Sequence, residues 1–382
     1  MQLIEQAPVT VRQVRVPLAI GVGVLVVAVA LLVVPWWTAG PGHRAVPRRA
    51  AFPSRVGGWS ATASSVRRAP LGAAVALADY GDGRWLAVGA DGTSYRTMPD
   101  ARAFTGRTDG TGLLSPDGRT VAIGGTDDLV RLVRLGDGSE HTYRIPHAHR
   151  VRVLAYAPDG RRLVCAVDGA GGTPDSVILL DPVRGTSLAL VTGTGRAATF
   201  SPDGGSIAVQ IGPDVQIVHR TGKMAGRVPD IGGTLAGPHA WSPDGRWLAL
   251  TDRTGRGVHF ASTDPGSGDT PPAALRDRRA RFVGWADPQT VFEQASGALL
   301  RQPITGTGHA RRVATVPSGA VLDDVATGLL TSPRLGIARG DADYGPPASW
   351  WLRTVIGIVA VVLAVLVAGG WALVRRRRAS EV

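Results

Sequence analysis

Two histidines are the most unusual of the residues in this sequence that could do chemistry. His147 and His149 stand in the stretch Pro146-His147-Ala148-His149-Arg150, between two apolar runs. Neutral imidazoles bind metal ions, and they also exchange protons near neutral pH. No third ligand follows at a suitable spacing, so we expect no metal site. The alternatives for this loop are a ligand-binding surface and a solvated loop.

A cluster of arginines forms a second candidate. Arg276, Arg278, Arg279 and Arg281 lie in another connection between apolar runs, where they could form a rim that attracts anions. An exposed, charged loop is the plainer interpretation of the same residues. We therefore take Arg279 and Arg281, with the two histidines, as binding candidates.

Catalytic sets are hard to assemble from the remaining residues. The sequence contains no G-x-S-x-G nucleophile turn, no P-loop and no H-E-x-x-H zinc motif. Glutamate occurs only at Glu5, Glu140, Glu293 and Glu381. Many of the aspartates precede glycine, where a turn explains them. We predict no catalytic residue and no cofactor.

A repeated tetrapeptide indicates how the candidates are positioned. The segments 115–118, 157–160, 201–204 and 242–245 read Ser-Pro-Asp-Gly, with Ala157 replacing serine in the second copy. The copies lie 42, 44 and 41 residues apart, and each separates two short apolar runs. A period of 40–45 residues with several strands per unit is typical of the blades of a β-propeller.

The tetrapeptide itself predicts a tight turn between two strands. Proline presets φ at the second position of the turn, and glycine accepts the left-handed conformation at its end. In one unit we predict strands at 151–157, 162–167, 177–180 and 187–191. The repeat residues are expected to serve as turns, with any binding site formed by other loops.

Degenerate copies extend the array in both directions. They are centred on Asp82-Gly83, on Asp287 and, more weakly, on Asp324. The prediction is an all-β fold with a six- to seven-bladed propeller. Seven blades are favoured, with the last blade completed by a strand from near Trp59–Arg68.

The unit S-P-D-G-R followed by a hydrophobic strand resembles the WD-like repeat of TolB-type propeller proteins. The resemblance covers roughly residues 57–340 and implies a fold more than an activity, because propellers host many functions. TolB proteins have a separate N-terminal domain and no membrane spans, and this chain differs in both respects.

Two apolar segments flank the repeats. Each of them, 18–37 and 352–374, is long enough to cross a hydrocarbon core of about 30 Å as a helix. The domain organisation that we predict is a cytoplasmic tail (1–17), a first span (18–37), a Pro/Gly/Arg-rich tether (38–58), the propeller (59–340), a short tether (341–351), a second span (352–374) and a basic cytoplasmic tail (375–382).

Basic residues predict the orientation of the two spans. Four consecutive arginines at 375–378 favour a cytoplasmic C-terminus, since positive charge is retained on that side. The propeller would then lie outside the cytoplasm of a bacterial cell, held at the plasma membrane. Arginines at 44, 48, 49 and 55 on the outer side of the first span leave the inverted topology open.

The net charge does not indicate nucleic-acid binding. The chain carries a formal charge of +12, but residues 70–349 contain 29 basic and 28 acidic residues, so the propeller is nearly neutral. The excess charge lies in the tails and the first tether. Basic segments in those places attract anionic lipid.

The function that we predict is a binding module, not an enzyme, for a protein or a cell-envelope component. The alternative is an extracytoplasmic propeller enzyme, such as a lactonase or a glycan-active hydrolase, with its residues spread over several blades.

Overall fold

The structure is a computed structural model that describes residues 50–345, except 82–84, 99–111, 126, 230, 256, 274, 276–279, 306–307 and 333–334, and also residues 357, 362 and 364. The chain divides into two compact units, 1–42 and 43–382. The first unit, the predicted span 18–37 and almost all of the predicted span 352–374 lie outside the described residues. Within the described part, no helix is both long and apolar enough to cross a membrane.

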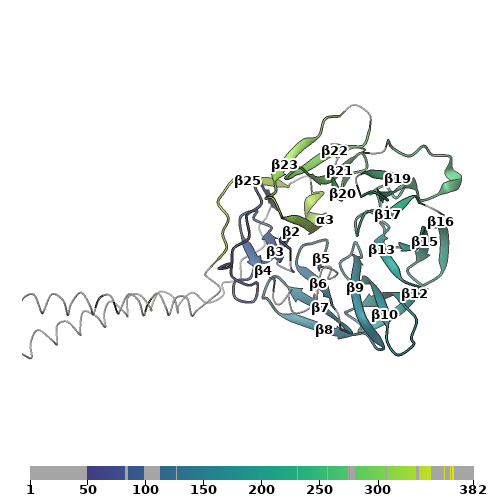
Figure 1. The fold of residues 1–382 in the computed structure, drawn as a ribbon, viewed down its shortest axis with the longest axis horizontal. Coiled ribbons are helices and arrows are strands. Elements are labelled where there is room, and N and C mark those ends of the chain that lie inside the picture. Colours follow the sequence, from purple (N-terminus) through teal and green to yellow (C-terminus); the bar gives the residue numbers. More distant parts are fainter. Residues whose placement is uncertain are drawn as a thin grey trace, which may run out of the picture. The chain divides into compact units, whose positions relative to one another are not determined.

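The described residues form a β-propeller of six blades. Six antiparallel sheets are arranged around a common centre, and each presents its first strand to that centre (Figure 1). Inner strands of neighbouring blades contact one another from β20 through β24, β5, β9 and β13 to β17. The all-β propeller predicted from the repeat is therefore confirmed, whereas the preference for seven blades was wrong.

Each blade is defined by its strands in order from the centre outward. Blade 1 is β24 (Val321–Val325), β2 (Ala74–Asp79), β3 (Trp85–Gly89) and β4 (Tyr95–Thr97); blade 2 is β5 (Gly112–Leu114), β6 (Thr120–Gly124), β7 (Leu129–Arg134) and β8 (Glu140–Arg144); blade 3 is β9 (Ala148–Tyr156), β10 (Leu163–Gly169), β11 (Ser176–Asp181) and β12 (Thr186–Thr192).

The second half of the ring follows the same order, although blade 5 has only three strands in the described part of the chain. Blade 4 is β13 (Gly195–Phe200), β14 (Ser206–Ile211), β15 (Asp214–His219) and β16 (Met224–Val228); blade 5 is β17 (Gly233–Leu235), β18 (Trp247–Asp252) and β19 (Val258–Ser262); blade 6 is β20 (Arg281–Asp287), β21 (Thr290–Ala295), β22 (Ala298–Pro303) and β23 (Arg311–Thr315).

Blade 1 closes the ring because it combines the two ends of the propeller. Its three outer strands come from the start of the array, and β24, from the end, pairs with β2 as the innermost strand. This arrangement explains the error in blade number. The degenerate copies near Asp82 and Asp324 are parts of one blade, although they were counted as two. Asp82-Gly83 itself lies between β2 and β3, outside the described residues.

The segment Trp59–Arg68 does not complete a blade as predicted. It runs outside β4, where Ser65 forms a parallel bridge with Thr97. Just before it, β1 (Ala51–Pro53) pairs in parallel with β25 (Gly336–Ala338). The two ends of the propeller are thus held together twice, by β24 on β2 and by β25 on β1.

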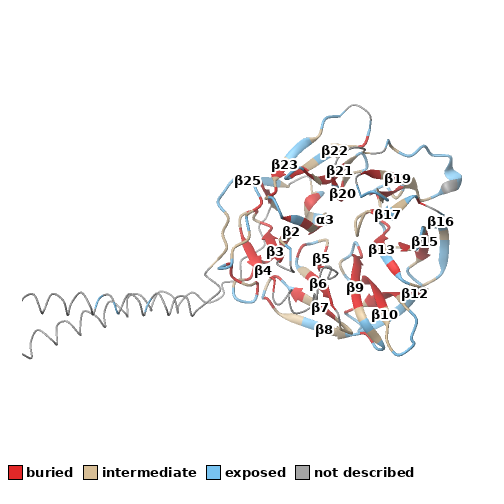
Figure 2. Cartoon of the chain, in the orientation of Figure 1, coloured by how far each residue is buried: buried red, intermediate tan, exposed pale blue. Residues whose placement is uncertain are grey.

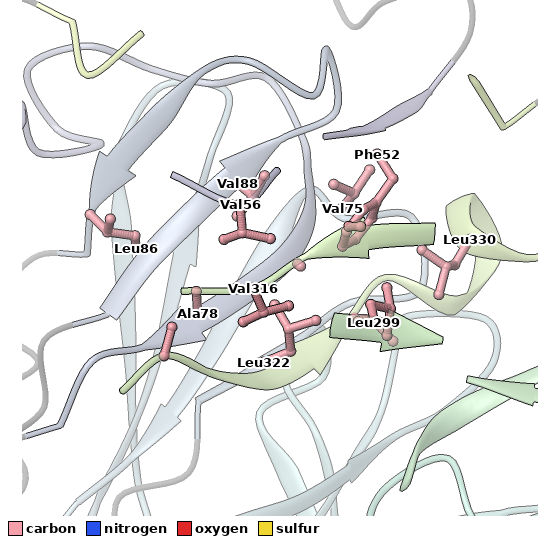
Figure 3. Packing of buried hydrophobic residues seen from close by; sticks show 14 of the residues in the cluster. Phe52, Val56, Val75, Ala78, Leu86, Val88, Leu299, Val316, Leu322 and Leu330 are labelled. Atoms are coloured by element: carbon pink, nitrogen blue, oxygen red, sulfur yellow. The ribbon is translucent and has the colours of Figure 1, made fainter. Parts of the chain in front are cut away.

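A hydrophobic cluster fills the space between these closing elements. Phe52 and Val56 from the N-terminal segment pack with Leu322 of β24 and Leu299 of blade 6 (Figure 3). All four side chains are at most 1% exposed. Burial of this much apolar surface stabilises the closed ring, at about 25 cal/mol per Å² removed from water.

Burial falls from the centre of the ring to its edge. Inner and second strands are mostly buried, whereas the outer strands β8, β12 and β16 are largely exposed (Figure 2). The only cysteine, Cys165 on β10, is fully buried, as expected for a small apolar side chain. Burial raises the pKa of its thiol to about 12, so the group stays protonated and unreactive at neutral pH.

The Pro-Asp-Gly turns have the predicted geometry. In the first copy, the Gly118 amide donates to the Ser115 carbonyl oxygen, and Gly118 has a φ of 68°. The Ser115 hydroxyl donates to Asp117 and accepts from the Thr120 amide. Serine and aspartate therefore stabilise the turn internally. In the second copy, Ala157 cannot make these bonds.

We predict opposite effects for two substitutions at this position of the turn. Ser242→Ala leaves the buried Trp247 amide without its acceptor, which lies 2.8 Å away, so unfolding should become easier by about 1–3 kcal/mol. Ala157→Ser supplies the missing hydroxyl to blade 3 and should add up to about 1 kcal/mol. Urea denaturation of both variants measures this. Equal effects of the two changes would contradict the role of the hydroxyl.

Candidate functional site

The Pro-Asp-Gly turns surround a pocket at one end of the propeller's centre. Every inner strand ends on this face, which we call the turn face. The pocket has a volume of about 290 Å³, and all six blades contribute to its wall. The prolines of all four repeat turns line it: Pro116, Pro158, Pro202 and Pro243.

Aromatic side chains form much of the remaining wall. Tyr156 and Phe200 come from the ends of β9 and β13, Trp241 from the loop after β17, and Trp285 from β20. The pocket is therefore mainly apolar, with rigid walls of rings and prolines. Such a site favours a small, mainly apolar ligand that carries a few polar groups.

His239 crosses the centre of the ring to reach Asp324. Its Nε2 lies 2.6 Å from Asp324 Oδ1, although the two residues belong to blades 5 and 1. The other carboxylate oxygen accepts from the Leu114 amide of blade 2 at 2.6 Å. An ionised carboxylate only accepts, so this bond requires a proton on Nε2.

The loop that carries His239 is held by its neighbours on both sides. The Thr199 hydroxyl of blade 4 donates to the Pro238 carbonyl oxygen at 2.9 Å. The Trp285 indole of blade 6 donates to the Ala240 carbonyl oxygen at 3.1 Å. With the bond from His239 to Asp324 of blade 1, three other blades fix this loop. The pocket is therefore preformed.

Tyr156 lines the pocket, but its hydroxyl is buried in the protein core. The residue is 8% exposed, and its hydroxyl has no hydrogen-bond partner among the described residues. Burial above all raises the pKa of Tyr156, and the nearby carboxylates of Asp117 and Asp324 raise it further. A buried hydroxyl without a partner costs free energy.

A second cavity of about 440 Å³ adjoins the first and shares Trp241, Pro202 and Pro243 with it. Asp203 and Asp244 of the neighbouring turns line this cavity. Hydrogen bonds from Ser201 and from the Gly205 amide lower the pKa of Asp203, so it is ionised at neutral pH. The turn face therefore presents carboxylates beside an aromatic pocket.

The predicted binding residues that the structure describes lie outside this pocket. His147 and His149 are exposed at the start of β9, whereas the pocket lies at its end, so they belong to the opposite face. Arg279 lies outside the described residues. Arg281 donates to the Leu322 carbonyl oxygen and forms an ion pair with Asp323 at 3.3 Å. Of the candidates that the structure describes, none lines the pocket.

No group of three or more potential metal ligands occurs within the described ranges. The residues that do form the pocket gave weak signals in the sequence. Tyr156 and Trp285 appear as ordinary strand residues, and His239 is a single histidine in a loop. Only the recurrence of proline at one position of each turn could have indicated that four such residues converge on one face.

Comparisons with known proteins give distant structural likenesses alone. No protein-family model matches the sequence, and no curated protein matches it either. Among solved structures, the chain is similar to TolB from Agrobacterium tumefaciens, with 18% identity and a TM-score of 0.40 over 53% of this chain and 79% of that one. It is also similar to the propeller domain of Cps50 (Swd1) from Myceliophteria thermophila, with 14% identity and a TM-score of 0.42 over 65% and 88%.

The carboxylate that pairs with Arg281 gives a pH-dependent prediction. Burial raises the pKa of Asp323 from 3.8 to about 6, in spite of Arg281. The folded state therefore binds this proton more tightly than the unfolded state, and the contribution of Asp323 to stability rises as the pH falls through 6 toward 4. Asp323→Asn should stabilise the protein by about 1–3 kcal/mol above pH 7, with no gain left near pH 4.

Thermal unfolding between pH 4 and 8 checks this prediction. Asp175→Asn is the control of opposite sign, since hydrogen bonds from Thr194 and the Gly169 amide lower the pKa of Asp175. That variant should lose stability relative to the parent chain as the pH rises above 4. A constant difference between Asp323→Asn and the parent chain at every pH would contradict the raised pKa.

Proposed function

We propose that this chain is a binding module that holds a protein or cell-envelope ligand at the pocket of the turn face. The observation that carries the proposal is the preformed aromatic pocket itself, to whose wall all six blades contribute. Hydrogen bonds from three other blades fix the His239 loop at its wall.

The proposal includes a location. Two membrane spans at 18–37 and 352–374 would hold the propeller outside the cytoplasm, with both termini inside. The apolar runs and the arginines at 375–378 support this topology. A bacterial plasma membrane fits these features, and the lipid bilayer is then one partner of the chain. The ligand is a protein or an envelope component, and nucleic acid is not expected because the propeller is nearly neutral.

An enzyme remains the second candidate because of the pair formed by His239 and Asp324. A histidine oriented by a buried carboxylate can act as a general base. The pocket wall, however, has only tyrosine and threonine hydroxyls as nucleophiles among its described residues. We therefore propose binding without turnover. Steady turnover of a lactone or a glycoside, lost in His239→Ala, would favour the enzyme.

Site-specific photocrosslinking in cells tests the binding function. A photoreactive residue at the exposed position Pro202 or Pro158 should yield a discrete adduct, because both prolines border the pocket. The same residue at His149, on the opposite face, is the matched control. Trp241→Ala should remove the adduct without loss of folding. An equal yield at His149, or an adduct that survives Trp241→Ala, would contradict the pocket as the binding site.

Reporter fusions test the topology. A reporter that is active only in the cytoplasm should work when fused at residue 382. A reporter that is active only outside the cytoplasm should work when inserted within 38–58. The reverse pattern would place the propeller in the cytoplasm and would contradict the proposed location.

A further inference from the structure

We propose that the turn face binds a neutral glycan through two linked sugar rings, one in the pocket and one in the adjoining cavity. This inference rests on the proposed binding function and specifies the chemistry of the same site. Three observations carry it: a fixed indole that lies between the two cavities, the uncharged lining of the pocket, and two carboxylate oxygens that the cavity offers to a ligand.

Trp241 provides the apolar wall that the two cavities share. Its side chain is half-buried and lines both of them. The indole Nε1 donates to the Gly245 carbonyl oxygen at 2.9 Å, and the Thr263 hydroxyl donates to the same oxygen at 2.9 Å. The edge of the indole is therefore fixed by a turn that is itself held. Aromatic faces carry negative charge and attract C–H bonds, which cover the faces of a sugar ring.

The pocket itself favours an uncharged ligand. Among the described residues of its wall there is no lysine, arginine, aspartate or glutamate. A charged group buried here would therefore lose water without gaining an opposite charge in the wall. The polar side chains at its half-buried or exposed positions are His239, Thr327 and Thr331. Sugar hydroxyls both donate and accept, so they match threonine and either protonation state of the imidazole.

The adjoining cavity offers two strong acceptors. Asp203 and Asp244 line it from equivalent positions of two neighbouring repeat turns. In each of them Oδ1 accepts from a serine hydroxyl and from an amide of its own turn. Neither Oδ2 has a hydrogen-bond partner among the described residues, so both are available to a ligand. Hydroxyl groups donate to carboxylates in short, strong hydrogen bonds.

Arginines near these carboxylates disfavour a simple cation as the ligand. Hydrogen bonds within the turn lower the pKa of Asp203, and the positive charge of Arg220 lowers it further. A hydrogen-bonded ion pair with Asp269 raises the pKa of Arg246, and the charge of Asp244 raises it further. Each lining carboxylate thus already has a positive charge nearby. A second cation would meet that charge, whereas a hydroxyl group would not.

The dimensions fit two rings rather than one. The pocket has a volume of about 290 Å³ and the cavity one of about 440 Å³. They share Pro202 and Pro243 as well as Trp241, so they are continuous at the rim. Together they lie within the range of small-molecule sites. A single sugar ring would leave one of the two empty.

Three neutral disaccharides test this chemistry on the full chain, solubilised in a detergent without a sugar headgroup. The probes are cellobiose, maltose and N,N′-diacetylchitobiose, and sorbitol is the open-chain control that has hydroxyls but no ring. With 5-fluorotryptophan in the protein, the resonances of Trp241 and Trp285 are assigned with Trp241→Phe and Trp285→Phe. We expect saturable shifts with at least one disaccharide, at an affinity at least tenfold above that for sorbitol.

Two variants locate the binding. Asp244→Asn keeps an oxygen for the bonds of the turn and removes the charged acceptor, so it should weaken disaccharide binding about tenfold. Trp241→Leu should abolish the saturable shift of Trp285. Asp159→Asn is the matched control, because Asp159 occupies the same position of the blade 3 turn and lines neither cavity. It should leave the affinity unchanged. Melting temperatures show whether each variant is folded.

The glycan proposal is overturned by no saturable shift with any of the three disaccharides up to their solubility. Affinity for sorbitol equal to that for the disaccharides would also overturn it, and so would equal effects of Asp244→Asn and Asp159→Asn. An adduct from the photoreactive residue at Pro202 that persists in any of these cases would leave the proposed binding function standing, with a ligand of another class.

Longer oligosaccharides distinguish a glycan chain from a free sugar. Cellotetraose, maltotetraose and N,N′,N″,N‴-tetraacetylchitotetraose extend the three disaccharides by two rings each. The tetrasaccharide of the preferred series should bind at least as tightly as its disaccharide, since both cavities open on the turn face. A tetrasaccharide that binds at least tenfold more weakly than its disaccharide would overturn the glycan chain in favour of a free disaccharide.

Discussion

Ring closure by β24 is the interaction on which the rest of the structure depends. This strand comes from the end of the array and pairs with β2 from its beginning, with Leu77 opposite Asp324. The pairing completes blade 1 and closes the contacts around the ring. It also places Asp324 where the Leu114 amide and His239 can both bond to it. The centre of the pocket therefore exists only when the ring is closed, and folding and site assembly are one event.

The Pro-Asp-Gly turns perform two tasks with different residues. Serine and aspartate bond to each other and to the turn amides, as in Ser201, where the hydroxyl donates to Asp203. Proline has no amide hydrogen that would need an acceptor. Its ring lies in the wall of the pocket. Every inner strand ends on the same face. The prolines of four repeat turns, one from each of four blades, therefore meet at the same pocket. The expectation that the repeat residues serve only as turns was therefore incomplete.

The sequence predicted what depends on local patterns. The strands expected at 151–157, 162–167, 177–180 and 187–191 correspond to β9 to β12, because the turn chemistry fixes where each strand starts. The number of blades could not be predicted in this way, because ring closure joins segments that are distant in the sequence. No local pattern indicates that Asp324 pairs with Leu77. The pocket could not be predicted for the same reason. His239 and Asp324 are 85 residues apart, and each is unremarkable in its own segment. His147 and His149 stay binding candidates on the opposite face, because a residue's type does not specify which face of a propeller it occupies.

Preorganisation is the property that the pocket gains from the closed ring. The loop that carries His239 is fixed by Thr199, Trp285 and Asp324, so the pocket keeps its shape when it is empty. A rigid pocket loses little conformational entropy when a ligand arrives. The same contacts that hold the loop in the empty protein thus favour selective binding.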